Sequence, residues 1–152
     1  MVPTPAFQPL LGRRVIDVTQ VLAGPYCSYQ LALLGAEVIK IELPDGGDWS
    51  RSNGPESSSD STGYTLPFVT QNSAKKSVTL NLKKPRAVAA LRALIASADV
   101  MVENFKPGTA AKLGIAYDDV KQLNPRLVYA SLSAFGHDGP LSRRPAYDHI
   151  IQ

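Results

Sequence analysis

Basic side chains follow several of the expected strand ends in the second half of the chain. Lys83 and Lys112 each come shortly after a strand, and Arg143 and Arg144 share the last long loop. Lysine and arginine in such turns suit an anionic ligand that carries phosphate groups. Solvated surface charges are the alternative, and residue type and position leave both interpretations open. The other cations nearby are expected to be solvated surface charges: Lys84, Arg86 and Lys121.

The spacing of the residues gives little support for a metal site or for a nucleophilic side chain. His137 and His149 have no cysteine pair near them, so we predict no metal site and expect both in loops or on the surface. Cys27 begins a helix, where the helix dipole can activate a thiol, but we interpret it as a small packing residue. Ser131 and Ser133 lie in a strand without a nucleophile elbow, so a serine triad is not supported.

A dinucleotide site is also disfavoured, although a glycine turn follows the first expected strand. Gly24 lies in that turn, and Glu42 ends the next strand, as in nicotinamide-binding folds. The turn reads VLAGPYC, however, with one glycine where the motif needs three. Pro25 removes a backbone N–H that a phosphate would use.

The elements that must position these residues alternate between strands and helices. Residues 14–19 (RVIDVT) and 37–43 (EVIKIEL) are predicted buried strands, and the helix between them begins at Pro25 and ends at Gly35. Such a connection predicts a parallel crossover and an α/β fold. The remaining expectations are a loop over 44–65, strands over 77–82, 99–105 and 127–134, a helix from Pro85 to Ala98, short helices over 110–113 and 117–123, and a helix from Ala146.

The turns after these strands should meet at one edge of the sheet. They cover residues 21–24, 43–47, 103–108 and 134–139. In open α/β sheets, ligands bind at the carboxyl ends of the strands. The sequence therefore predicts a binding edge formed by these turns.

Composition limits the class of protein. The 152 residues are 44% apolar and 19% charged, which is typical of one globular domain, and no apolar run is long enough to span a membrane. The net charge of +3 is small for a nucleic-acid binder. The single cysteine suits a reducing cytoplasm. Apolar residues appear just before Gln152, inside what should be a first helical turn, so we expect the natural chain to continue.

Several segments together resemble one enzyme family. The segment LLGRRVIDVTQVLAGPYCSYQLALLGAEVIKIELPDGGDWSR resembles the opening of the family III CoA-transferases, a group that includes formyl-CoA transferases, carnitine-CoA transferases and α-methylacyl-CoA racemases. The segments KKSVTLNLKKP, ADVMVENFKPGTAAKLGI, LNPRLVYASLSAFGHDGP and RRPAYD resemble the same family in the same order. The resemblance extends from Leu11 to Gln152.

The resemblance implies a Rossmann-like parallel sheet with flanking helices, forming the N-terminal part of a large CoA-binding domain over residues 1–152. It implies coenzyme A or acyl-CoA as substrate with no permanently bound cofactor, carboxylic acids as the other substrate, and an interlocked homodimer, with neither nucleic acid nor membrane as partner. The implied CoA contacts are the backbone of Val21, Leu22 and Ala23, the adenosine-side residues Leu80, Asn81, Leu82 and Lys83, the pantetheine-side residues Asn104, Phe105 and Lys106, the phosphate ligand Lys112, and the thioester-side pair Tyr147 and Asp148.

The same resemblance implies that the catalytic residue lies outside this chain. Family transferases use an aspartate that attacks the thioester, forms a mixed anhydride and then an enzyme thioester. We expect that aspartate beyond Gln152, together with the small domain. Racemases of the group carry a histidine where this chain has Tyr147, a weak base at neutral pH, so transferase is preferred and racemase is the alternative. A third possibility is an inactive CoA-binding fragment or half-domain.

Some relatives have a CoA-binding arginine where this chain has Leu43, and Arg51 could replace it only if its loop folds back.

Overall fold

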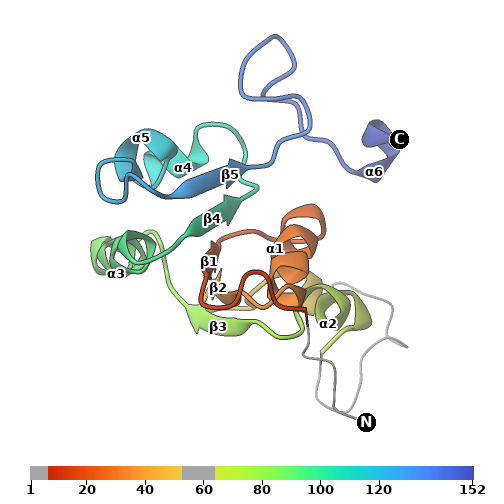
Figure 1. Ribbon diagram of the computed structural model, residues 1–152. Coiled ribbons are helices and arrows are strands. Elements are labelled where there is room, and N and C mark those ends of the chain that lie inside the picture. Colours follow the sequence, from red (N-terminus) through yellow and green to blue (C-terminus); the bar gives the residue numbers. More distant parts are fainter. Residues whose placement is uncertain (1–6, 53–63) are drawn as a thin grey trace.

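In the described part of the chain, five parallel strands form one sheet with helices on both faces (Figure 1). The computed structural model describes residues 7–52 and 64–152. The strands are β1 (Arg14–Asp17), β2 (Glu37–Glu42), β3 (Lys76–Thr79), β4 (Val100–Glu103) and β5 (Val128–Ser131), in the order β3-β2-β1-β4-β5. The predicted α/β fold with a parallel sheet is confirmed.

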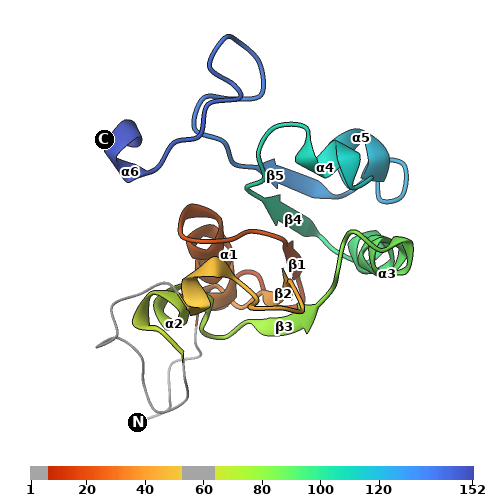
Figure 2. The same cartoon turned by 180° about the vertical axis from the view of Figure 1, so that it is seen from behind.

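The helices form a layer on each face of the sheet. On one face lies α1 (Ala23–Leu33), with α2 (Leu66–Asn72) beside it; on the other lie α3 (Pro85–Ala96), α4 (Thr109–Lys112) and α5 (Tyr117–Val120) (Figures 1 and 2). Successive strand residues point to opposite faces, so each strand contributes to both layers. Val15 packs on the α1 side, and the next residue, Ile16, packs on the α3 side with Leu91 and Ile95.

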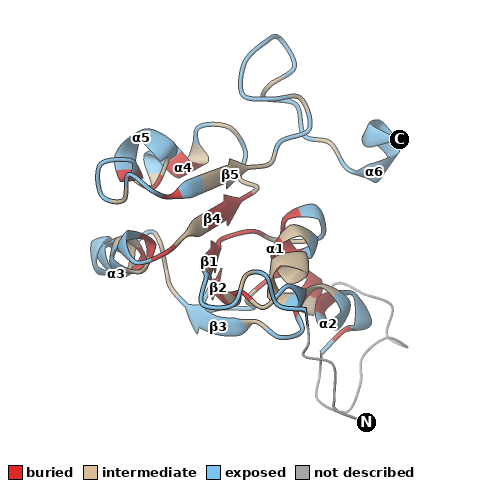
Figure 3. Ribbon diagram, viewed as in Figure 1, coloured by how far each residue is buried: buried red, intermediate tan, exposed pale blue. Residues whose placement is uncertain are grey.

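Burial on both faces explains why β1, β2 and β4 are rich in valine and isoleucine. Figure 3 shows that buried residues gather in these central strands. Parallel sheets covered by helices have this kind of strand. The helix predicted to begin at Pro85 is confirmed, and its residues Leu91 and Ile95 are fully buried.

The chain reverses its direction of travel across the sheet between β1 and β4. It proceeds from β1 through β2 to the edge strand β3, and α3 then returns it to β4 on the other side of β1. The loops after β1 and β4 therefore diverge from neighbouring strands at the centre of the sheet. Such a switch point is where ligands bind in open α/β folds.

The third strand and the first helix differ in part from the expected elements. The strand predicted over 77–82 is confirmed as β3, but it ends at Thr79, and all four of its residues are exposed where the alternation predicted a half-exposed strand. As an edge strand it pairs with β2 alone, and the apolar Leu80 and Leu82 reach the core from the following turn instead. Helix α1 begins at Ala23, two residues before Pro25, while Gly35 has the expected positive φ at its end.

The expected loop over 44–65 is only partly a loop. A 3-10 helix covers Trp49–Arg51, and residues 53–63 lie outside the described residues. Helix α2 follows at once, because the Thr65 hydroxyl accepts the Phe68 N–H at 3.3 Å and caps its first turn. The motif Thr65–Leu66–Pro67 is a helix start signal that the composition of the preceding segment concealed.

The chain after β5 runs away from the sheet to a short helix, α6 (Asp148–Ile151), with no buried residue (Figures 1 and 2). This helix begins two residues later than expected. Within the described ranges, no helix has the length and apolar character needed to cross a membrane.

Candidate functional site

The loops after β1 and β4 are joined by the side chain of Asn104. Its Oδ1 accepts the Gln20 N–H at 3.0 Å, and its Nδ2 donates to the Gln20 carbonyl at 2.8 Å. The two hydrogen bonds fix the relative position of Val21–Ala23 and Asn104–Lys106. The structure therefore brings two of the predicted CoA-contacting segments together at the switch point.

A buried carboxylate, Glu103, holds the second of these loops. Its Oε2 accepts the Phe105 N–H at 2.8 Å, and its Oε1 accepts the Ser131 hydroxyl. His137 Nε2 lies 2.8 Å from Ser131 Oγ on the other side. Because the Ser131 proton is directed to Glu103, this serine is not arranged as a nucleophile that His137 deprotonates.

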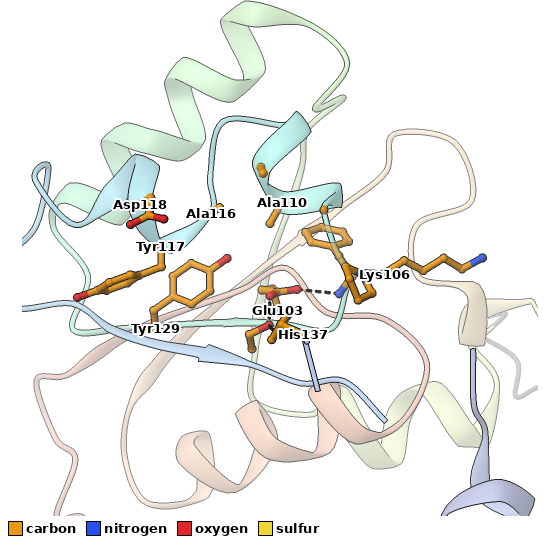
Figure 4. Close-up of a pocket in the computed structure, with 13 residues that line it drawn as sticks. Glu103, Lys106, Ala110, Ala116, Tyr117, Asp118, Tyr129 and His137 are labelled. Carbon is orange, nitrogen blue, oxygen red and sulfur yellow. Dashed lines mark hydrogen bonds between the residues drawn. The ribbon is translucent and has the colours of Figure 1, made fainter. Parts of the chain in front are cut away.

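A cavity of about 540 Å³ opens beside these groups, under α4 and α5 (Figure 4). Its lining includes the rings of Phe105, Tyr117 and Tyr129, and the ring centres of Tyr117 and Tyr129 are 6.0 Å apart. Burial raises the pKa of the Tyr129 phenol, and nearby Glu103 raises it further. The Tyr129 hydroxyl has no hydrogen-bond partner among the described residues. An aromatic wall with a few polar groups suits the less polar part of a ligand.

A second cavity of about 300 Å³ gathers cations at the same edge of the sheet. Lys106 and Lys112 line it from the segment after β4, and Arg143 lines it from the last loop. All three side chains are exposed, and none has an ion-pair partner within residues 7–52 and 64–152. Three unpaired cations around one cavity suit a ligand with phosphate groups.

Other predicted contacts lie outside both cavities. The residues Leu80, Asn81, Leu82 and Lys83 follow β3 at the edge of the sheet, where the Asn81 side chain accepts the Lys83 N–H at 3.1 Å. Tyr147 is 73% exposed at the start of α6, and Asp148 accepts a hydrogen bond from Gln152 at 2.7 Å. These six residues line neither cavity, so their predicted roles stay predictions.

A buried network of charges supports the loop after β1, and sequence reasoning missed it. The Lys40 ammonium lies 2.8 Å from Asp48 and 3.9 Å from Asp17, and the Lys75 ammonium lies 2.9 Å from Asp17. Burial lowers the pKa of Lys75, and Asp17 opposes that shift. Burial raises the pKa of Asp48, but Lys40 and Ser50 outweigh it, so this pKa lies below its usual range. The sequence signal was Lys40 itself, since a lysine inside a buried strand needs a partner.

Arg51 does not replace the arginine that some relatives have where this chain has Leu43. Its loop does fold back, but its guanidinium forms two 2.7 Å hydrogen bonds with Glu42 and stacks 3.8 Å from the Phe68 ring. Burial raises the Glu42 pKa, and the hydrogen bonds from Arg51, Ser77 and the Asp48 N–H lower it more, from 4.5 to about 2. Arg51 is therefore committed to Glu42.

We expect Glu42→Gln to lower the free energy of unfolding by about 2 kcal/mol at neutral pH. The folded pKa of Glu42, about 2, lies below its usual 4.5, so its contribution is present above pH 4.5 and lost as the pH falls toward 2. Urea unfolding of both proteins between pH 7 and pH 3 checks this. A difference in stability that stayed constant over this pH range would contradict it.

Cys27 is less reactive than its place at a helix start suggested. Burial raises the pKa of its thiol, and the charge of Asp17 raises it further. The side chain packs against the buried cluster that contains Val15 and Val38. Among the described residues, no group of three His, Cys, Asp or Glu side chains is placed to hold a metal ion.

Comparison with known proteins gives consistent matches. The model of CoA-transferase family III matches residues 10–152. The chain is 42% identical over 145 residues to succinyl-CoA:glutarate CoA-transferase of Mus musculus, covering 95% of the chain and 33% of the relative. It is 45% identical to acetyl-CoA:oxalate CoA-transferase of Acetobacter aceti, covering 95% of the chain and 36% of that relative. The chain thus spans about a third of the length of these curated relatives.

A solved structure gives the same match in three dimensions. A CAIB/BAIF family protein from Brucella suis superposes with a TM-score of 0.89 at 40% sequence identity. The match covers 95% of this chain and 38% of that protein.

Proposed function

Because the chain belongs to CoA-transferase family III, we propose that it forms the CoA-binding part of an enzyme that moves coenzyme A between carboxylic acids. The observation that carries this proposal is the cavity at the carboxyl edge of the sheet, where Lys106, Lys112 and Arg143 meet without ion-pair partners among the described residues. Coenzyme A carries several phosphates and a long, less polar arm. The cationic cavity would bind the phosphates, and the neighbouring aromatic cavity offers space for a less polar part.

The names of the similar proteins support the type of reaction. Each name pairs an acyl-CoA with a carboxylic acid: succinyl-CoA with glutarate, and acetyl-CoA with oxalate. We propose the same substrate classes for the whole protein, with a homodimer as its working form and no permanently bound cofactor. The exposed apolar residues of α6, Ile150 and Ile151, offer surface that such an assembly could cover.

We propose that the nucleophile is an aspartate outside these 152 residues. The two buried glutamates at the edge already have structural partners: Glu103 binds Ser131 and Phe105, and Glu42 binds Arg51. The 152-residue chain, given an acyl-CoA and a carboxylate, is expected to show no CoA exchange when products are followed by chromatography. Measurable turnover would show that its nucleophile is present in this chain.

Lys112→Ala is expected to weaken CoA binding about tenfold, because one charge-assisted contact to phosphate is lost. Isothermal titration of the chain with CoA measures this change. Arg86→Ala is the matched control, since Arg86 is an exposed cation outside both cavities. Equal affinities for Lys112→Ala and the unchanged chain would contradict the proposed phosphate site, and absence of CoA binding would contradict the proposed function.

A further inference from the structure

The backbone of Val21 adopts a conformation that valine rarely takes. Its φ is +73°, in the left-handed region, where a β-branched side chain is strained. Strained residues persist only where their surroundings hold them, and they cluster at ligand-binding and active sites. Val21 is also the first of the three residues proposed to contact CoA through their backbone, so this inference rests on the proposed function.

Side chains from four separate segments hold the residues just before and at this position. Asp17 accepts the Thr19 N–H at 2.9 Å, and Lys40 donates to the Thr19 carbonyl at 2.9 Å. Asn104 binds both backbone groups of Gln20. Asp48 Oδ1 accepts the Val21 N–H itself, at 3.2 Å. The backbone is therefore fixed at each residue up to the strained one.

Asp48 is rigidly placed for this task. Its side chain is fully buried, and its Oδ2 lies 2.8 Å from the ammonium of Lys40, which is 1% exposed. Its Oδ1 also accepts the N–H and the hydroxyl of Ser50, at 2.9 and 2.7 Å, and its own N–H donates to Glu42 at 2.9 Å. A buried carboxylate held on every side can impose a backbone conformation without moving.

We propose that Asp48, held by Lys40, is a positioning residue that keeps Val21 in the left-handed conformation and so presents the backbone of Val21–Ala23 to CoA. Asp48 need not touch CoA, because it acts through the peptide N–H of Val21. If Asp48 had a merely structural role, replacing it would lower stability, and its effect on CoA affinity would not depend on which residue occupies position 21.

The test is a cycle of Asp48→Ala and Val21→Gly, with CoA affinity measured by isothermal titration. Glycine adopts positive φ without strain, so it should not need Asp48. Asp48→Ala alone is expected to weaken CoA binding about tenfold or more, and Val21→Gly should restore affinity in the double variant to within about threefold of the unchanged chain. Glu37→Ala is the control and should leave CoA affinity unchanged, because Glu37 pairs with Arg14 and Lys76 at the start of β2, at the opposite edge of the sheet.

Equal losses from Asp48→Ala with and without Val21→Gly would overturn the proposal. If Asp48→Ala does not fold, Val21→Pro tests the proposal instead. Proline cannot adopt a positive φ, so this variant removes the left-handed conformation and leaves the Lys40–Asp48 pair intact. We expect Val21→Pro to weaken CoA binding about tenfold or more, and unchanged affinity would overturn the proposal. If the unchanged chain does not bind CoA, the proposed function fails. The φ angle of Val21 in a crystal structure of Asp48→Ala then tests the positioning role, which a retained positive angle would overturn.

Discussion

Replacing Asp17 with alanine is expected to lower the free energy of unfolding by about 3–5 kcal/mol. Asp17 is fully buried at the end of β1 and is the partner of two cations, Lys75 at 2.9 Å and Lys40 at 3.9 Å. Its carboxylate also accepts hydrogen bonds from Thr19 and Ser28. Alanine would leave Lys75 buried with its main countercharge removed. Because small domains are stable by only about 5–15 kcal/mol, the variant should be close to unfolding.

Urea unfolding of three variants separates the causes of this loss. Asp17→Asn keeps an oxygen that can accept the Thr19 N–H but removes the charge, so it should fall between the unchanged chain and Asp17→Ala. Asp45→Asn removes an exposed charge and should change stability by less than about 0.5 kcal/mol. A loss below about 1 kcal/mol for Asp17→Ala would mean that the buried network is not a source of stability.

Gly24→Ala is expected to cost about 3 kcal/mol and to abolish measurable CoA binding. A Cβ at residue 24 would lie 2.4 Å from both Cβ and Cγ2 of Thr19. Thr19 is fully buried and held by Asp17 and Lys40, so it cannot move aside without disrupting the charge network. Either the helix start or the loop before it must shift, and both belong to the proposed site.

A second glycine provides the control for this variant. Gly12, just before β1 at the opposite edge of the sheet, has a φ of +82°, but a Cβ there meets no atom within 4 Å. Gly12→Ala should therefore cost about 1–2 kcal/mol from backbone strain and leave CoA affinity unchanged. Thermal unfolding and CoA titration of both variants are the measurements. Equal losses of stability for the two variants would contradict a steric origin.

The sequence predicted those parts of the fold that local patterns determine. Runs of valine and isoleucine in 14–19 and 37–43 became β1 and β2, and the apolar periodicity after Pro85 became α3. Helix α2 was missed because its start signal at Thr65 follows a segment rich in Ser, Gly and Asp. The exposure of β3 was missed because edge position depends on strand order, which periodicity does not specify.

The sequence predicted cations that line the candidate site but not the buried charges that hold its loops in place. Lys112 and Arg143 were singled out by residue type and by their turns, and the structure places both around one cavity. Lys40, Asp48 and Lys75 were not singled out, because their pairing joins residues far apart in the chain and depends on the tertiary fold. Their burial could not be predicted either, since a charged residue normally lies at the surface.

We propose that CoA binds along the carboxyl edge of the sheet, at the switch between β1 and β4. Titrating isotopically labelled chain with CoA and following backbone amide shifts by NMR tests it most directly. We expect shifts at saturation to concentrate in Val21–Ala23, Asn104–Lys106 and around Lys112. Absence of shifts, or shifts confined to α2 and α3 on the flanks of the sheet, would contradict it.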